Sequence, residues 1–194
     1  MNREQKKNAT RQAIIDAALT LFAAHGYAGT SVNQIAEAAG VAKGTFFNYF
    51  AGKEQVLCDI QHTLATEHFA KLEGTEGPIL PLLREALMDM IRQLPDERTL
   101  MLAVIQMKLH SPALLEQERA DTENFMRMLT DIVAYAQERG EISRSLPAKV
   151  IAELAVQTYD GALLYWCKGF GEERLVNQMA ISFELFFRGL VPEK

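Results

Sequence analysis

Apolar residues recur with helical spacing along almost the whole chain, and glycines and prolines separate the periodic segments. In residues 11–27, the side chains of Ile14, Ala18 and Leu21 follow one another three or four positions apart. This spacing predicts an amphipathic helix, and Gly26 is the expected end of that helix. The carboxy-terminal part shows no strand periodicity, so the pattern predicts an all-α fold of about nine helices.

A second, shorter helix is predicted directly after the first. Thr30 or Ser31 can cap its free amide groups, and Gln34 stands where the partner of Ser31 in a capping box would stand. Gly40 can adopt the left-handed conformation that ends this helix, so the chain can turn and start a third helix within two residues. Helix, glycine turn and helix together predict a helix-turn-helix unit.

The third predicted helix has one apolar side and one side suited to nucleic acid. Phe46 and Phe50, four residues apart, can pack inward. The opposite side combines a cation, a glycine, small polar groups and aromatic rings: Lys43, Gly44, Thr45, Phe47, Asn48 and Tyr49. Such a surface suits phosphates and base edges, although Phe47 could also belong to the core.

Further phosphate contacts are expected next to this surface. A fourth helix begins near Gly52, and Lys53 in its first turn is predicted to meet a phosphate. A hydroxyl of Thr30 or Ser31 at the start of the second helix is predicted to meet another. We therefore include Thr30, Ser31 and Lys53 in the predicted DNA-binding surface.

The segment that carries these elements closely resembles the amino-terminal DNA-binding domain of the tetracycline-repressor (TetR/AcrR) family of bacterial transcription regulators. Three features share one register: the LF...G end of the first helix, the run TSVNQIAEAAGVAKGT and the exit YF..KE..L. The resemblance covers about a quarter of the chain. It implies a DNA-binding domain in residues 1–52, with a helical regulatory and dimerisation domain in residues 53–194.

Two positions depart from the family pattern. Ala42 stands where a serine or threonine usually opens the recognition helix, so a side-chain cap is missing. Phe47 stands where a tyrosine is common, and a phenylalanine ring cannot donate a hydrogen bond to a phosphate. Tyr49 and Asn48 are then expected to supply that hydrogen bond.

The distribution of charge agrees with a DNA-binding amino terminus. The whole chain has a net charge of −5, but residues 1–53 carry six basic and three acidic side chains, a net charge of +3. Arg3, Lys6 and Lys7 form either a solvated surface or a disordered basic arm that lies on the DNA backbone or in the minor groove.

Beyond residue 52, breaks at glycine and proline divide the chain into six further predicted helices. Their approximate ranges are 53–73, 78–94, 98–109, 112–139, 148–168 and 172–190. The last two each carry two apolar stripes, which predicts two packing partners, the chain itself and a second copy. The residues expected at this homodimer interface are Ala155, Ala162, Met179, Phe183 and Phe187. The alternative is a large monomeric core.

A set of aromatic, thioether and polar residues on the fourth to eighth helices could line a cavity for a small hydrophobic ligand. The candidates are His68, Met101, Ile105, Thr122, Phe125, Leu129, Tyr159 and Trp166. The competing interpretation is that most of them are ordinary core residues.

Other classes of function find little support. No nucleophile motif or phosphate-binding loop occurs, Cys58 with His62 is only half a metal site, and no cofactor is expected. Neither a signal sequence nor a spanning segment is visible, so we expect a cytoplasmic protein without membrane contact. The hypotheses are a repressor released from a palindromic DNA operator by a ligand, a DNA-binding activator or architectural protein without a ligand, and a helical enzyme.

Overall fold

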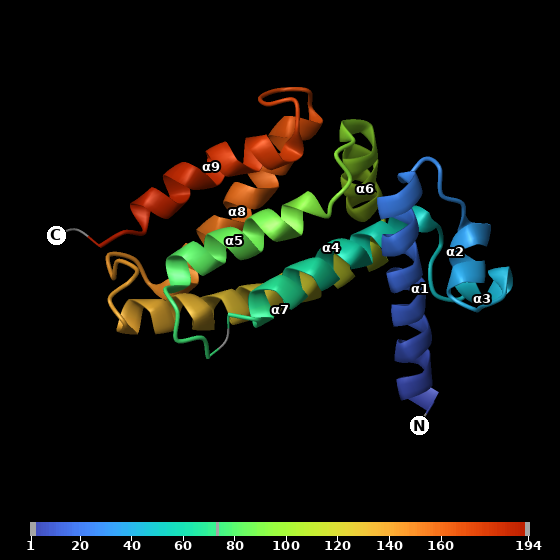
Figure 1. Ribbon diagram of the computed structural model, residues 1–194, viewed down its shortest axis with the longest axis horizontal. Helices are drawn as coiled ribbons and strands as arrows, with labels where there is room; N and C mark the ends of the chain where they lie inside the picture. The colour runs from blue at the N-terminus through green and yellow to red at the C-terminus, as the bar shows by residue number, and fades with distance from the viewer. Residues whose placement is uncertain (1–2, 73, 193–194) are drawn as a thin grey trace. The chain divides into compact units, whose positions relative to one another are not determined.

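The computed structural model describes residues 3–72 and 74–192, with side chains from Gln5 onward, and these residues form nine α-helices and no strand (Figure 1). The helices are α1 (Arg3–His25), α2 (Val32–Ala38), α3 (Lys43–Phe47), α4 (Lys53–Ala70), α5 (Ile79–Arg92), α6 (Arg98–His110), α7 (Pro112–Glu138), α8 (Ala148–Cys167) and α9 (Leu175–Gly189). The predicted all-α fold is therefore confirmed.

The chain divides into two compact units, residues 1–63 and 64–194. The predicted boundary between residues 52 and 53 falls at the start of α4, whereas the first compact unit includes the first half of that helix. The core of the first unit comes from all four of its helical segments. It contains Ile14, Ile15, Ala18, Ile35, Ala36, Phe46, Phe50, Val56, Leu57 and Ile60.

In the second unit, α8 packs against α6, α7 and α9, and α5 packs against α9 and α7 (Figure 1). Its core includes Ile79, Leu83, Ile91, Met101, Val104, Ile132, Ala136, Ile151, Ala152, Leu163, Trp166 and Met179. Among the helices of the described ranges, none has the length and the low charge that crossing a bilayer requires.

Two helix starts differ from the sequence prediction by three residues or more, and α4 ends at Ala70, before the predicted residue 73. The expected disordered arm is wrong for Lys6 and Lys7, because α1 begins at Arg3 and both lysines are exposed on this helix. Residues 4–10 contain good helix formers and no glycine or proline, so nothing interrupts the first helix there. The side chain of Arg3 lies outside the described residues.

The last helix begins at Leu175, later than the predicted residue 172. The Asp96 carboxylate accepts the Leu175 amide at 2.7 Å, and the carbonyl of Glu173 accepts the Trp166 indole N–H at 3.0 Å. These partners lie elsewhere in the fold and hold residues 172–174 in a turn. Local sequence pattern therefore could not locate this helix start.

Candidate nucleic-acid interface

The helix-turn-helix begins with a complete capping box at α2. The Ser31 hydroxyl accepts the Gln34 amide at 3.3 Å, and the Gln34 side-chain oxygen accepts the Ser31 amide at 2.8 Å. Gly40 has φ +68°, which favours glycine at the turn that follows. The helix α3 starts after Ala42, whose side chain provides no cap, as its sequence indicates.

The short helix α3 is fixed by two buried phenylalanine rings. Phe46 and Phe50 are almost completely buried, and their ring centroids lie 5.8 Å apart. Phe47 is 49% exposed and touches Phe46 edge-on at 5.5 Å, so its ring is not part of the core. Anchoring by two rings leaves the opposite side of α3 rigid and free for a contact.

That opposite side is polar and cationic. Lys43, Gly44 and Asn48 are exposed, and Thr45 and Tyr49 are half-buried. A Cβ built on Gly44 would meet no atom within 4 Å, so the glycine is not required by the packing of the protein itself. The main chain of Gly44 is open to a close approach by another molecule.

Two residues of the predicted surface lie elsewhere. Thr30 is 1% exposed, and its hydroxyl donates to the carbonyls of Gly26 at 2.9 Å and Leu21 at 3.2 Å. The inclusion of Thr30 in the DNA surface is therefore wrong, because its polar groups satisfy the end of α1. Ser31 is exposed, although its hydroxyl is engaged in the capping box.

The Lys53 side chain points into the first unit. Its Nζ donates to the carbonyls of Tyr27 at 2.7 Å and Thr30 at 2.9 Å. In the structure the Lys53 ammonium therefore binds the protein's own carbonyls, in place of the predicted phosphate contact. A sequence pattern reveals a cation next to the recognition helix, but it does not reveal competing carbonyl acceptors from a loop 23 and 26 residues away.

The predicted interface residues on α8 and α9 lie mostly within one protomer. Met179, Phe183, Phe187 and Ala162 are buried, and Ala155 is half-buried. The assignment of the first four to a dimer contact is wrong, because packing against the same chain already covers them. The stripe on α9 that contains Met179 and Phe183 belongs to the core of the second unit.

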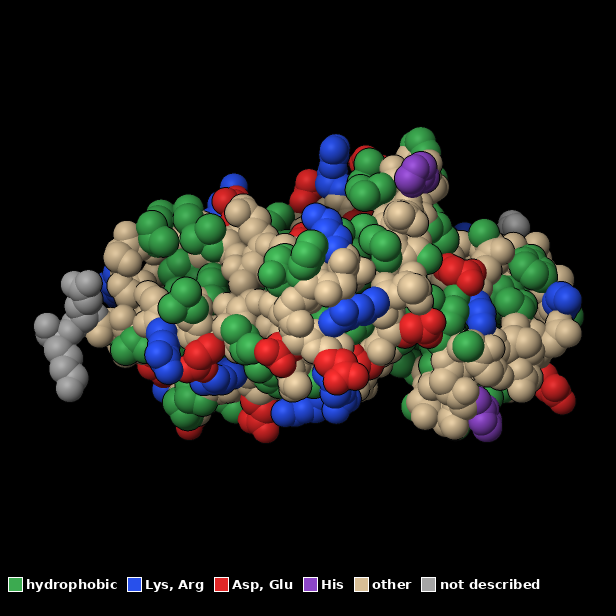
Figure 2. Space-filling view, turned by 90° about the horizontal axis from the view of Figure 1, so that it is seen from above, with side chains coloured by type: hydrophobic (Ala, Val, Ile, Leu, Met, Phe, Trp, Pro, Cys, Tyr) green, Lys and Arg blue, Asp and Glu red, His purple; other side chains and the backbone are tan. Residues whose placement is uncertain are grey.

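The exposed side of these two helices also carries apolar groups. It includes Leu154, Leu164 and Tyr165 on α8 and Ile181 and Leu185 on α9, with Leu185 77% exposed. Figure 2 views the side of the second unit that carries α9 and shows hydrophobic side chains on its surface. The four-residue spacing of Ile181 and Leu185 was the sequence signal that could have identified this side.

The predicted ligand-binding residues lie mainly on α6, α7 and α8, three helices that pack together. Met101, Leu129 and Trp166 are buried, whereas Ile105, Thr122 and Tyr159 are half-buried. Three of the polar or aromatic candidates have partners within the protein. These are His68 with Gln93 at 2.7 Å, half-buried Phe125 edge-on to Phe69 at 5.1 Å, and Trp166 with the Glu173 carbonyl.

Tyr159 differs from the other candidates because its surroundings shift the pKa of its side chain. Burial raises the pKa of its hydroxyl well above the ordinary value, and the neighbouring carboxylate of Asp160 acts in the same direction. Tyr159 is therefore a neutral phenol at physiological pH. Such a group can donate or accept a hydrogen bond.

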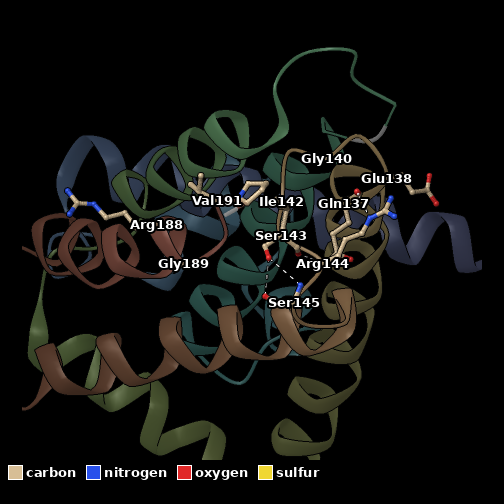
Figure 3. Close-up of a pocket in the computed structure, with 11 residues that line it drawn as sticks. Gln137, Glu138, Gly140, Ile142, Ser143, Arg144, Ser145, Arg188, Gly189 and Val191 are labelled. Atoms are coloured by element: carbon tan, nitrogen blue, oxygen red, sulfur yellow. Dashed lines mark hydrogen bonds between the residues drawn. The ribbon is translucent and has the colours of Figure 1, made fainter. Parts of the chain in front are cut away.

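The cleft shown in Figure 3 lies at another place in the second unit, between the α7–α8 loop and the end of α9. It has a volume of about 660 Å³, and none of the predicted ligand residues lines it. Gln137, Ser143, Arg144 and Ser145 form one wall, where Ser145 donates its amide to the Ser143 hydroxyl at 3.2 Å. Sequence reasoning did not find this polar cleft, because no motif distinguishes its loop residues.

No metal centre is evident in the part of the chain that the structure describes: three His, Cys, Asp or Glu side chains nowhere converge there.

Residues 14–60 match the sequence profile of the family described as "Bacterial regulatory proteins, tetR family". This match spans α2 and α3 together with residues 14–25 of α1 and 53–60 of α4.

The similarity to individual proteins extends over nearly the whole chain. The HTH-type transcriptional repressor DhaR of Mycobacterium sp. (strain GP1) is 26% identical over 186 residues, 90% of each chain. The fatty acid metabolism regulator protein of Bacillus subtilis (strain 168) is 23% identical over 192 residues, covering 96% of this chain and 98% of that protein.

Solved structures show the same architecture. Thermus thermophilus FadR, a TetR-family transcriptional repressor crystallised in complex with lauroyl-CoA, is 24% identical. It aligns with a TM-score of 0.60 over 95% of this chain and 96% of its own. At this identity the likeness concerns the fold.

Proposed function

We propose a function from the premise that this chain belongs to the tetR family of bacterial regulatory proteins. The protein is a sequence-specific DNA-binding transcription regulator. It acts as a homodimeric repressor that binds a palindromic operator and leaves it when a small apolar or aromatic ligand binds. It performs this role by binding alone, without catalysis.

The observation that carries the DNA-binding part of the proposal is the two-sided construction of α3. Phe46 and Phe50 hold the helix from within, while Lys43 and Gly44 on the helix and Asn48 at its C-cap are exposed. In DNA recognition, cations and hydroxyls on phosphates position a helix, and side chains that reach base edges give specificity. Lys43 and Tyr49 are the proposed phosphate contacts, and Thr45 and Asn48 the proposed base contacts.

Selection of bound fragments from a pool of random duplex DNA tests this function. We expect the pool to converge on a two-fold symmetric sequence with half-sites about 34 Å apart or a multiple of that distance. Thr45→Ala should change which sequences are enriched, whereas Lys43→Met should weaken all sequences alike. A pool that stays random through successive rounds contradicts sequence-specific binding.

The dimer follows from the exposed apolar side chains of α8 and α9. Ile181 and Leu185 lie one turn apart on α9, and Leu154 and Leu164 are exposed on α8. Exposed apolar side chains gathered on two packed helices are typical of protein interfaces, and a two-fold copy of the same surface is a suitable partner. Pairing two protomers brings together the two copies of α3 that a palindromic operator requires.

The proposed ligand site lies in the interior of the second unit. Phe125 and Tyr159 are half-buried on neighbouring helices, and Tyr159 adds a neutral phenol to the apolar ring of Phe125. An apolar compound with one polar group suits such an environment. Acyl-chain compounds belong in a first screen, because one relative is named a fatty acid metabolism regulator.

The alternative is a DNA-binding activator or architectural protein without a ligand, and a competition experiment separates the two. A ligand that releases DNA must itself bind more weakly when DNA is present, by the same factor. We expect at least one apolar compound to release the selected duplex, and Phe125→Ala to reduce that response. If every compound that binds leaves the DNA complex intact, the alternative is correct.

A further inference from the structure

Lys53 is the first residue of α4, a position where a cation is unfavourable for the helix because the amino-terminal end of the helix dipole is positive. The following residue, Glu54, has the charge that this end favours. Helix stability therefore does not explain a lysine at residue 53. Its contacts outside the helix do.

The ammonium group of Lys53 is enclosed by the α1–α2 turn. Nζ donates to the carbonyls of Tyr27 at 2.7 Å and Thr30 at 2.9 Å, and it lies 4.1 Å from the centroid of the Tyr27 ring. An ammonium group has three N–H donors. Two are used by these carbonyls, and the ring face adds a cation–π contact.

Tyr27 is tied to the same helix a second time. Its hydroxyl donates to the Glu54 carboxylate at 2.5 Å, and its ring packs on Phe22 of α1 at 5.1 Å. The first two residues of α4 thus hold one tyrosine by its carbonyl, its ring and its hydroxyl. The turn held in this way leads directly into Ser31, the cap of α2.

A second charged pair joins α1 to α4 further along. Arg11 forms an ion pair with Asp59, and its guanidinium lies 5.3 Å from the centroid of the Phe50 ring. These ties explain why the first compact unit continues into α4 as far as residue 63. They also show that cations next to the recognition helix serve the protein's own packing.

We infer that Lys53 is a positioning residue for DNA binding, acting through Tyr27 rather than through a phosphate. It fixes the α1–α2 turn to the start of α4. This turn then positions the capped start of α2 beside α3. A shift of the first turn of α4 then displaces the DNA-binding surface. This inference rests on the proposed DNA-binding function.

A double-mutant cycle distinguishes the two roles. Lys53→Met and Tyr27→Leu are made singly and together in the full-length protein, and affinity is measured for the duplex recovered by selection. We expect each single variant to lose about tenfold in affinity, and the double variant little more than either one, because both remove the same connection. A lysine that contacts only phosphate gives losses that multiply.

The salt dependence of binding supplies an independent measurement, with Lys43→Met as the matched control. Loss of one phosphate contact per protomer makes the slope of log affinity against log salt less negative by about 1.8 per dimer. We expect that change in Lys43→Met and a clearly smaller one in Lys53→Met. Multiplying losses in the cycle, or a slope change in Lys53→Met equal to the control, overturns the inference.

A third measurement needs no DNA and keeps the two proposals separate. The Thr30 amide donates to the Tyr27 carbonyl at 3.2 Å within the turn that Lys53 holds. We expect this amide to exchange its hydrogen about tenfold faster in Lys53→Met and at the original rate in Lys43→Met. Unchanged exchange in Lys53→Met overturns the inference, whereas faster exchange in a protein that binds no duplex supports the connection and contradicts only the proposed function.

Discussion

The two units of this protein differ in how many of their large apolar side chains are exposed. In residues 5–63, Phe47 is the one large hydrophobic side chain that is exposed, and it lies on the proposed DNA surface. In the described part of residues 64–194, eleven such side chains are exposed, among them Leu109, Leu154, Ile181 and Leu185. The first unit has enough interior for its apolar groups, whereas the second has apolar surface that it does not cover itself.

This difference indicates how each unit finds its partner. The surface of the first unit suits a charged, hydrated partner, for which directional hydrogen bonds and cations provide recognition. The surface of the second suits a partner of the same chemistry, and burial of apolar area stabilises such an association. Substitutions that are severe in one unit and harmless in the other therefore test the comparison.

The largest effect is expected for Leu185→Glu on α9. If Leu185 meets a second copy, the substitution places two charges in an apolar contact, which destabilises association by several kcal/mol. Sedimentation should show a folded monomer that no longer binds the selected duplex. Leu109→Glu, at a side chain that is 63% exposed on α6, is the matched control and should remain dimeric. If the Leu185→Glu variant remains dimeric, the dimer contact lies elsewhere.

A buried neighbour of Leu185 provides a second test of which α9 side chains meet a second copy. Phe187 lies two residues later and is 8% exposed. Phe187→Glu should therefore lower the thermal stability of the protomer itself, because the charge enters the core of the second unit. If Phe187→Glu instead gave a well-folded monomer, Phe187 would belong to the dimer interface, as its apolar stripe predicted.

The next effect concerns the first unit. Gly44→Ala places a methyl group where the protein has no atom within 4 Å, and alanine favours a helix over glycine by about 0.5–1 kcal/mol. The free protein should lose no stability, while affinity for the selected duplex falls because the backbone can no longer approach it closely. Gly189→Ala, at a similarly open site at the end of α9, is the control. Unchanged DNA affinity in Gly44→Ala excludes a close approach there.

The sequence predicted the local features of the first unit well. The capping box at Ser31, the left-handed Gly40 and the inward pair Phe46 and Phe50 all depend on residues within a few positions of one another. For Thr30 and Lys53 the sequence did not reveal the hydrogen-bond partners, because these come from elsewhere: the end of α1 for Thr30, and the α1–α2 turn for Lys53.

In the second unit, helix positions were predictable but partners were not. Apolar periodicity identifies which sides of a helix are buried, without identifying whether its own chain or another covers them. Met179 and Phe183 face the protomer's own core, while Ile181 and Leu185, outside both predicted stripes, are exposed. The start of α9 likewise depends on Asp96, a residue 79 positions away.

A smaller effect is expected from Ala42→Ser at the start of α3. The Ala42 backbone already has the extended conformation of a helix cap, with ψ 149°, but its side chain makes no capping hydrogen bond. A serine hydroxyl can accept an amide of the first turn, which stabilises a helix by about 1 kcal/mol. Urea unfolding should show this gain in the first unit with unchanged dimerisation. A loss of stability would mean that the start of α3 cannot accommodate the cap.

The smallest effect at neutral pH belongs to Tyr159, within the second unit. Burial raises the pKa of this hydroxyl in the folded state, whereas the unfolded chain has an ordinary tyrosine pKa of about 10. Below that pH the phenol is neutral in both states, so its ionisation does not affect stability. Above it, the unfolded state loses a proton that the folded state keeps, and the free energy of unfolding falls as pH rises. Tyr159→Phe should reduce this fall between pH 9 and about 11.5 while changing stability little at pH 7. Equal alkaline losses in both proteins would show that the hydroxyl is solvated, and would remove Tyr159 as the neutral polar group of the proposed ligand site.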